Sequence, residues 1–254
     1  MIERKSTVCG AVLLAAGRGS RLKPHTNSIP KPLLPVNGKP TLDLYFEGLR
    51  AAGVSDTVLV THHLAELVES YAQDVPARFG IKCATIEQPQ LDGTASALQS
   101  VINQVDGAVQ GEKSIVKQVI GSSFLLMATD YLIPPNFIED LLAFHVSHSA
   151  AVTVSLKRVP EAELASRSSA RFDEEGRILE IVEKPLPGTA PSDLAANLAF
   201  VLPADLCAYV SDVKGSIRGE REVQSAINAY LADGGTCRGL IQGTPDEWSP
   251  ERNL

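Results

Sequence analysis

The sequence predicts an α/β fold in which a parallel sheet carries helices on both faces, followed by a smaller α+β portion on the same sheet. Two observations predict it. Short apolar runs typical of buried strands alternate with helix-spaced apolar stripes through about residue 157, which favours parallel strands joined by helical crossovers. Beyond that point the alternation stops, and strand-like runs surround a loop rich in proline, glycine and serine.

The strands and helices of the first part follow one another in a regular order. The expected strands are 12–14, 57–61, 81–86, 124–128 and 151–156. The expected helices are 41–53, 64–71, 97–105 and 138–145, with Thr41 as a cap and Gly53 as a stop for the first of them. Because parallel sheets bind ligands at the carboxyl ends of their strands, the loops after Leu14, Ile86 and Ala128 are expected on one rim.

The second part has fewer clear signals. Strands are expected at 178–183 and 198–202, and a helix at about 220–231 that stops near Gly234–Gly235. The polar segment 106–123 is expected to be a loop. No linker is evident, so we expect one unit spanning 1–254.

Composition and charge exclude several classes of protein. The 254 residues carry 23 basic and 30 acidic side chains, a net charge of −7, which argues against a surface that coats nucleic acid. A hydrophobic fraction of 44% argues against global disorder. No run reaches the ~18 apolar residues that span a membrane. The cysteines are far apart and form no CxxC pair, which favours a reducing cytoplasm over a disulfide scaffold or a zinc cluster; they are Cys9, Cys83, Cys207 and Cys237.

The amino terminus resembles the front of a signal peptide only in part. Arg4 and Lys5 precede the apolar run 8–16. However, Gly10 interrupts that run and Arg18 follows it closely. A short apolar run of this kind is more often a buried strand, which is the interpretation we adopt.

The stretch with the richest chemistry is LAAGRGSRLKPHTNSIPKPL, residues 14–33. Its small residues Ala15, Ala16, Gly17 and Gly19 allow backbone amides to approach a phosphate or a base. Arg21 and Lys31 add cations that can neutralise a triphosphate, and prolines on both sides stiffen the chain around the lysine.

Three other interpretations of this stretch are weaker. A dinucleotide fingerprint needs a third glycine where Leu22 stands, and no GxxxxGK[ST] string of a P-loop is present. A plain strand-to-helix turn with solvated charges would explain the glycines alone, but it would not explain the whole twenty-residue string.

From Gly17 to Leu33 the sequence matches GxG[ST]RLxPxTxxxPKPL without a gap, and it thereby resembles the sugar-1-phosphate nucleotidylyltransferases, above all the glucose-1-phosphate uridylyl- and thymidylyltransferases. The resemblance runs from about residue 8 to 245. Its further segments are 88–95 (QPQLDGTA), Asp130 at a strand end, Glu183-Lys184-Pro185, Asn197, 218–222 and 228–231.

This resemblance implies a Rossmann-like three-layer mixed sheet of the nucleotide-diphospho-sugar transferase type. It implies one domain, with a nucleotide-binding part over about 1–157 and a sugar-binding part over about 158–254. The implied reaction is in-line attack of a sugar-1-phosphate on the α-phosphorus of a nucleoside triphosphate, assisted by Mg²⁺, with release of pyrophosphate. The net charge, the dispersed cysteines and the lack of a membrane-length apolar run lead us to expect a cytoplasmic protein with no nucleic-acid or membrane partner.

The site residues also follow from the resemblance. Those implied in catalysis are Arg21, Lys31, Asp130 and Lys184. Those implied in nucleotide binding are Leu14, Ala15, Ala16, Gly17, Gly19, Ser20, Arg21, Lys31, Gln88, Gly93 and Thr94. Glu183, Lys184 and Asn197 are implied at the sugar phosphate, and Asp130 at Mg²⁺. The carboxamide of Gln88 can pair with uracil or thymine, so UTP or dTTP is favoured.

The sequence also departs from the family pattern. The late Gly243-Thr-Pro245 is present, but Ile241 stands where a second metal-binding aspartate is expected, with Asp246 nearby. Thr129 precedes Asp130 where glycine is common, and 169–171 (SAR) replaces an expected glycine. The chain ends soon afterwards, so no acyltransferase domain is expected.

These departures leave alternatives open. A catalytically weak relative could bind a nucleotide or nucleotide-sugar as a sensor or subunit. A glycosyltransferase would need a DxD motif, which Asp130-Tyr-Leu lacks. His62-His63 and the pair His145 and His148 have no evident third ligand, so zinc is disfavoured. The sugar and the oligomeric state are left open.

Overall fold

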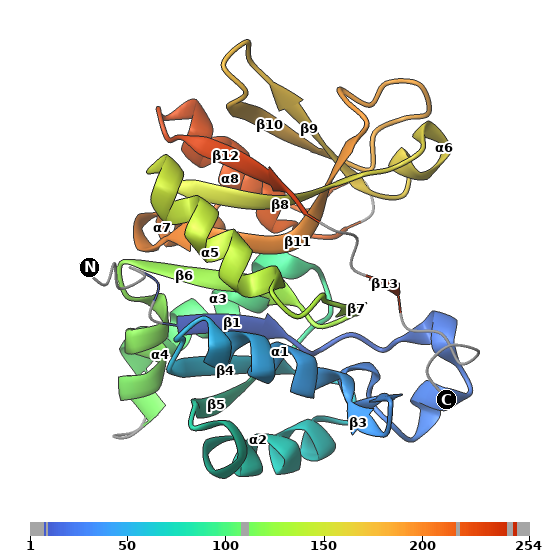
Figure 1. Cartoon of the computed structure of the whole chain (residues 1–254), viewed down its shortest axis with the longest axis vertical. Coiled ribbons are helices and arrows are strands. Elements are labelled where there is room, and N and C mark those ends of the chain that lie inside the picture. Colours follow the sequence, from blue (N-terminus) through green and yellow to red (C-terminus); the bar gives the residue numbers. More distant parts are fainter. Residues whose placement is uncertain (1–7, 9, 108–111, 217–218, 243–245, 248–254) are drawn as a thin grey trace.

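The computed structural model describes residues 8, 10–107, 112–216, 219–242 and 246–247 (Figure 1). Within them a nine-stranded mixed sheet forms the middle layer. Its parallel part has the order β5 (Lys82–Glu87), β4 (Asp56–Thr61), β1 (Gly10–Leu14) and β6 (Ser123–Ala128). The parallel pairing confirms the prediction for these four strands, and it places Val60 and Ala128 on either side of Leu14 at the carboxyl edge. The fifth strand expected in the first part, at 151–156, does not join them: it pairs antiparallel with one strand of the second part and parallel with another.

The second part of the chain continues the same sheet with antiparallel strands. The long strand β11 (Leu194–Pro203) pairs antiparallel with β6, with β8 (Val152–Arg158) and with β9 (Ser168–Phe172). β10 (Ile178–Glu183) pairs antiparallel with β9, and β12 (Cys237–Ile241) pairs parallel with β8. Two short ribbons, β2 (Pro35–Val36) with β3 (Lys39–Pro40) and β7 (Tyr131–Leu132) with β13 (Asp246–Glu247), lie outside this sheet.

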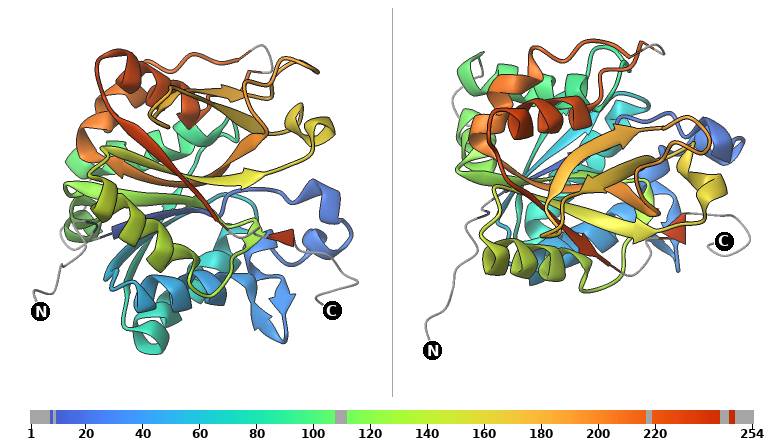
Figure 2. Two further views of the ribbon diagram at one scale, coloured as in Figure 1. Left: turned by 45° about the horizontal axis from the view of Figure 1, so that its top comes forward. Right: turned by 90° about the horizontal axis from the view of Figure 1, so that it is seen from above.

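Helices cover both faces of the sheet and make the outer layers (Figures 1 and 2). One face carries α1 (Thr41–Ala51), α2 (Ala65–Phe79) and α5 (Phe137–His148). The other carries α3 (Thr94–Gly107), α4 (Glu112–Ile120), α7 (Cys207–Val210) and α8 (Val223–Ala232). The remaining helical pieces are α6 (Glu161–Leu164), η1 (Ser20–Leu22), η2 (His25–Asn27), η3 (Lys31–Leu33) and η4 (Ala204–Leu206).

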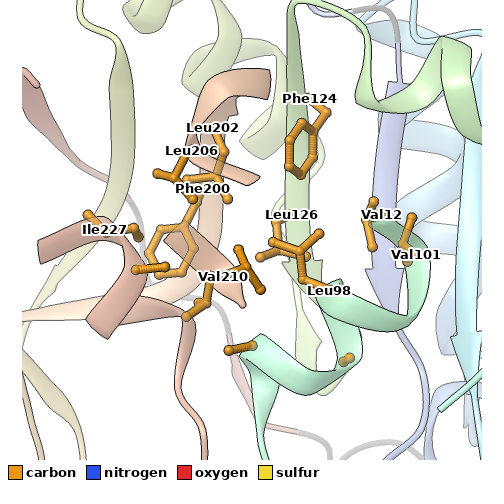
Figure 3. Packing of buried hydrophobic residues seen from close by; sticks show 14 of the residues in the cluster. Val12, Leu98, Val101, Phe124, Leu126, Phe200, Leu202, Leu206, Val210 and Ile227 are labelled. Atoms are coloured by element: carbon orange, nitrogen blue, oxygen red, sulfur yellow. The ribbon is translucent and has the colours of Figure 1, made fainter. Parts of the chain in front are cut away.

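Each central strand sends alternate side chains into two separate cores. Val12, Phe124 and Leu126 pack toward Leu98 and Val101 of α3 (Figure 3). Their neighbours along the same strands, such as Leu13 and Leu125, pack on the opposite face. Because successive strand side chains point to opposite faces, a strand buried on both sides is apolar throughout.

The prediction of a loop over 106–123 is wrong. α3 continues to Gly107, α4 covers Glu112–Ile120, and β6 begins at Ser123. Among the side chains of α4 whose burial the structure describes, those of 115–120, Val116 and Val119 are the buried ones. The backbone of Val119 lies so near β1 that a Cβ on Gly10 would be 2.3 Å from its Cα. Two buried apolar positions give a weak periodic signal.

Other boundaries were also misjudged. Thr41 does not cap α1: its hydroxyl donates to the Leu34 carbonyl at 2.8 Å, and Pro40 precedes the helix. The strand expected at 198–202 is the longer β11, and neither β9 nor β12 was expected. The described chain contains no helix long and apolar enough to cross a membrane.

Candidate active site

Two hollows meet at the carboxyl edge of the parallel strands. The loop hollow, of about 360 Å³, is lined by Gly17, Gly19, Ser20, Arg21, Leu22, Lys31 and Asp130. The strand hollow, of about 540 Å³, lies between the two parts of the chain, and its lining includes Glu183, Lys184, Asn197, Ser168, Gln224 and Glu222. Arg21 and Asp130 line both hollows. The two cavities therefore form one continuous polar site.

The loop after β1 owes its shape to Gly19. Its φ is +58°, a conformation that favours glycine, and a Cβ there would be 2.8 Å from Thr26 Cγ2 and 3.2 Å from Lys31 Cβ. The Thr26 hydroxyl donates to the Gly19 carbonyl at 2.9 Å. Gly17 differs, because a Cβ there would meet nothing within 4 Å. Gly19 is thus needed for packing that positions Lys31, whereas Gly17 keeps the hollow open.

The cations and the carboxylate expected in catalysis are brought together. Lys31 Nζ is 3.4 Å from Asp130 Oδ2. Lys31 begins η3 in the long loop after β1, and Asp130 follows the end of β6, the strand beside β1. Asp130 Oδ1 is buried and accepts no hydrogen bond within the described chain. A buried unpaired acceptor costs about 1–3 kcal/mol, and more for a charged one. This oxygen is therefore a ready ligand for a hard cation.

The residues directly after β1 serve mainly as structure. Ala15 and Ala16 are buried, and the Ala15 amide already donates to the Val60 carbonyl at 2.8 Å. The Leu14 carbonyl accepts a hydrogen bond from the Thr129 hydroxyl at 2.8 Å. Thr129, which stands where glycine is common in the resembled family, thus ties the ends of β6 and β1 together. The lining of neither hollow includes Leu14, Ala15, Ala16 or Thr129.

Lys184 lies at the end of β10 in a conformation that non-glycine residues seldom adopt, with a φ of +45°. Its Nζ is 3.6 Å from Glu183 Oε1 and 3.4 Å from Glu220 Oε2. Its amide donates to the Arg167 carbonyl at 2.8 Å. Unusual backbone conformations persist where the surroundings hold them, often at functional sites. Here the turn directs the ammonium into the strand hollow.

Asn197 enters the strand hollow from an irregularity in β11. Residues 194–196 pair with β8 in one register, and the register shifts before Phe200. β11 pairs with β9 on one side of this shift and with β6 on the other. The Asn197 amide lies 3.4 Å from the Ser155 hydroxyl, to which it donates. Bulges commonly re-aim a side chain next to a site, which explains why this polar residue lies inside a strand.

Thr94 joins the first part of the chain to the second. Its hydroxyl donates to Glu222 Oε2 at 2.7 Å and accepts from the Val223 amide at 2.9 Å. Thr94 lines the strand hollow and not the loop hollow. Burial raises the pKa of Glu222, and the nearby carboxylates Glu183 and Glu220 raise it further. The hydrogen bond from Thr94 lowers it, but the net shift is upward.

Gln88 and Gly93 lie together at the start of α3, outside the lining of both hollows. Gln88 is only 3% exposed, and its Nε2 donates to the Gly93 carbonyl at 3.2 Å. Gly93 has a φ of +121°, and a Cβ there would be 2.3 Å from the Arg221 carbonyl oxygen. The absence of a side chain at Gly93 is therefore explained by packing against Arg221, without any contact to a base.

Several residues of the strand hollow were missed by sequence reasoning. Ser168 and Gln224 are buried and line it, together with Arg167 and Glu222. One signal was present: Gln224 is a polar residue between the buried Val223 and the buried Ala226 of an apolar helix. A lone polar residue on a buried helix face requires a polar partner.

Comparison with known proteins identifies the family of this chain. Residues 10–244 match the family described as nucleotidyl transferase. The chain belongs to the nucleotidyl transferase family. The sequence resemblance stated above is thus confirmed, and so is the expected mixed sheet with flanking helices.

Curated members of this nucleotidyl transferase family act on more than one nucleotide. The chain is 30% identical over 251 residues to a UTP–glucose-1-phosphate uridylyltransferase of Synechocystis, covering 96% of this chain and 63% of that protein. It is 29% identical to a glucose-1-phosphate thymidylyltransferase of Streptomyces griseus, and the match covers 89% of this chain and 58% of that protein. It is also 29% identical to a probable mannose-1-phosphate guanylyltransferase of rice, and that match covers 69% of this chain and 45% of the rice protein. The chain thus spans about half to two thirds of these relatives.

Solved structures show the same fold. A crystal structure of UDP-glucose pyrophosphorylase complexed with UDP-glucose superposes with a TM-score of 0.77 at 21% identity, covering 93% of this chain and 91% of that one. An apo form of UDP-glucose pyrophosphorylase gives the same TM-score at 21% identity, covering 92% and 90%.

The second metal-binding carboxylate implied by the resemblance was expected where Ile241 stands. Ile241 ends β12 with 53% of its surface exposed. Asp246 lies opposite Leu132 in the β13–β7 pair, two residues along from Asp130 in that register. The side chain of Asp246 and the whole of 243–245 lie outside what the structure describes.

Proposed function

We propose that this chain transfers a nucleoside monophosphate from a nucleoside triphosphate, UTP or dTTP by preference, to a sugar-1-phosphate, with release of pyrophosphate. The observation that carries the proposal is that Arg21 and Asp130 line both hollows. A triphosphate in the loop hollow and a sugar phosphate in the strand hollow would meet between these two residues. That is where the α-phosphorus must be attacked.

The side chains supply positioning and counter-charge for in-line attack. Arg21 makes no ion pair with the described residues and so has its guanidinium available, and with Lys31 it would neutralise the leaving pyrophosphate. Lys184 would hold the sugar phosphate, whose oxygen is the nucleophile. Since phosphoryl-type transfers depend on orientation and electrostatics, no covalent enzyme intermediate is needed.

Mg²⁺ fits the site because Asp130 Oδ1 is a buried carboxylate oxygen with no donor in the described chain. When bound, the ion would stabilise charge on the phosphate oxygens. Within the described residues no group of three His, Cys, Asp or Glu side chains is arranged to hold a metal. Phosphate and water oxygens, with Asp246 as the candidate second carboxylate, would therefore complete its shell.

The strand hollow suits a polyhydroxylated ligand. Glu183 can accept hydrogen bonds from sugar hydroxyls, and the Asn197 carboxamide can both donate and accept. The carboxylate of Glu222 and the hydroxyl of Ser168 extend the same polar wall. These groups, together with Lys184, support a ring that carries one phosphate.

We also propose a cytoplasmic setting, for which the thiols offer support. The described cysteines Cys83, Cys207 and Cys237 are free, and Cys9 lies outside the described residues. Burial raises the pKa of Cys83 to about 12 and that of Cys207 to about 11. Such thiols stay protonated and unreactive at neutral pH.

A substrate matrix tests the proposed reaction. Purified protein with Mg²⁺ is incubated with each of UTP, dTTP, GTP, CTP and ATP against a panel of sugar-1-phosphates, and pyrophosphate is measured. We expect turnover with a pyrimidine nucleotide and the 1-phosphate of at least one sugar whose ring carries no charged group. If no pair turns over while a nucleotide-sugar still binds tightly by calorimetry, the chain is a sensor or subunit, the role that the loss of a carboxylate at Ile241 would favour.

A further inference from the structure

Three polar side chains from three different elements meet at the inner end of the strand hollow. Ser168 comes from β9, Glu183 from the end of β10 and Gln224 from the first turn of α8. The Ser168 hydroxyl donates to Glu183 Oε2, and Gln224 Nε2 lies 3.2 Å from the same oxygen. Gln224 Nε2 also donates to Ser168 Oγ at 3.1 Å. All three residues line the hollow.

The two partners of Glu183 are held more firmly than Glu183 itself. Ser168 and Gln224 are each 5% exposed, whereas 21% of the Glu183 side chain is exposed. The amide group of Gln224 is oriented by two acceptors, while its Oε1 is buried and has no partner in the described chain. The opposite amide orientation would set a carbonyl oxygen against the carboxylate, so Glu183 itself determines which way the carboxamide lies.

The two oxygens of Glu183 therefore differ. Oε2 accepts from Ser168 and Gln224, whereas Oε1 is 3.6 Å from Lys184 Nζ. Lys184 is also 3.4 Å from Glu220. Without the two donors, nothing in the described contacts would keep the Glu183 carboxylate from turning fully onto Lys184. That turn would withdraw both a hydroxyl acceptor and the phosphate-binding cation from the substrate.

We infer that Ser168 and Gln224 are positioning residues that hold the Glu183 carboxylate for a neutral ring hydroxyl of the bound sugar phosphate. This inference rests on the proposed function. It concerns residues that stand outside the signature string, and Ser168 is next to the segment 169–171 in which the sequence departs from the resembled pattern. The two residues act through Glu183 and do not touch the reacting phosphorus.

Matched variants test the inference. Ser168→Ala removes one donor, and Gln224→Met removes the other with little change of volume. Ser169→Ala is the first control, because the buried Ser169 is the next residue of β9 and its hydroxyl donates to the Ser192 carbonyl at 2.8 Å instead. Gln99→Met is the second, because Gln99 also has a buried, unpartnered Oε1 but donates to Asn103 in α3.

Initial rates are measured against each substrate in turn, with glucose 1-phosphate and UTP as probes if the substrate matrix gives no better pair. We expect both test variants to raise the KM for the sugar phosphate roughly tenfold or more, the ratio typical of lost hydrogen bonds to a charged group. The KM for the nucleotide should change less than about twofold, and Ser168→Thr, which keeps the hydroxyl, should restore most of the loss. Both controls should resemble the wild type.

A binding experiment separates this inference from the proposed function. Calorimetry with UDP-glucose and with UTP is performed on wild type and variants, since binding does not require turnover. Weaker UDP-glucose binding with unchanged UTP binding supports the positioning role. Equal effects on both ligands, or none, would overturn it. Wild-type protein that neither turns over nor binds any sugar-containing ligand would overturn the proposed function, and this inference with it.

Discussion

Lys31 Nζ lies 3.4 Å from Asp130 Oδ2, although 99 residues separate the two in sequence. They meet because β1 and β6 are parallel neighbours whose last residues, Leu14 and Ala128, are in register. This register places Asp130 and the loop after β1 on one rim. The path of that loop, in which Gly19 packs closely against Lys31, then brings the cation to the carboxylate. Only 17% of the Lys31 side chain is exposed, whereas Asp130 is more open at 38%.

Removing the cation tests the role of this pair. Lys31→Ala should lower kcat/KM by about 10²-fold or more, the loss seen when an aimed transition-state donor is removed. Arg21→Ala should have a comparable effect. The fold should survive, because neither side chain belongs to the apolar cores. Lys39→Ala is the control: Lys39 pairs with Glu47 at 3.2 Å on an exposed surface, and such pairs contribute little. Near-normal rates in both rim variants would refute the assignment.

Replacing the carboxylate tests the metal site. Asp130→Asn should abolish Mg²⁺-dependent activity, because a neutral amide is a far weaker ligand for a hard dication. Mn²⁺ binding, followed by electron paramagnetic resonance, gives a second readout that does not depend on turnover. Asp74→Asn on the exposed side of α2 serves as control. If Asp246→Asn is equally damaging, Asp246 substitutes for the carboxylate missing at Ile241. A fully active Asp130→Asn would show that another residue holds the ion.

We expect the base preference to depend on Gln88. We expect UTP or dTTP to exceed CTP by roughly tenfold to a hundredfold in kcat/KM, because cytosine would leave polar groups unpaired. Gln88 already donates to the Gly93 carbonyl, so its Oε1 is the atom expected to accept N3–H of the base. Gln88→Ala should reduce the preference. A preference for CTP or GTP that Gln88→Ala leaves unchanged would show that this side chain does not select the base.

Gly93 offers a test of packing between the two parts of the chain. Gly93→Ala would combine a positive φ with a Cβ 2.3 Å from the Arg221 carbonyl oxygen. Gly80→Ala has a positive φ but open space around the Cβ, so it isolates the conformational cost of about 1–2 kcal/mol. We expect Gly93→Ala to lower the free energy of unfolding, measured in urea, by clearly more than Gly80→Ala. Equal losses would mean that the loop relaxes without cost.

His145 should make stability depend on pH. Burial lowers its pKa, and its Nδ1 is 2.8 Å from the Thr153 hydroxyl. The unfolded chain then binds the proton first as pH falls, so this contribution is intact above about 6.5 and declines below it, by at most about 1.4 kcal/mol per pH unit. In urea titrations between pH 7 and 5, His145→Gln should show a smaller decline than wild type. The exposed variant His148→Gln should decline like wild type.

Much of the fold could be predicted because its signals are local. Continuous apolar runs and helical stripes indicated the parallel half, and the string from Gly17 to Leu33 indicated a phosphate-binding loop at its rim. Since parallel strands align their carboxyl ends, the order of elements places the loop after β1 and Asp130 on one rim. The contact of Lys31 with Asp130 depends in addition on the path of that loop. α4 was missed because, among its described side chains at 115–120, the buried ones are Val116 and Val119, and two apolar positions give a weak periodic signal.

What the sequence by itself determined is the parallel sheet, the rim at its carboxyl edge and the cationic side chains that the loop after β1 carries. Only the tertiary structure decided how the strand hollow is built. Ser168 and Gln224 are 56 residues apart, and they meet because β11 changes partners at Asn197 and α8 packs behind β10. Contacts of this kind depend on the register of antiparallel strands and on how helices dock, and neither leaves a periodic signal in the residues concerned.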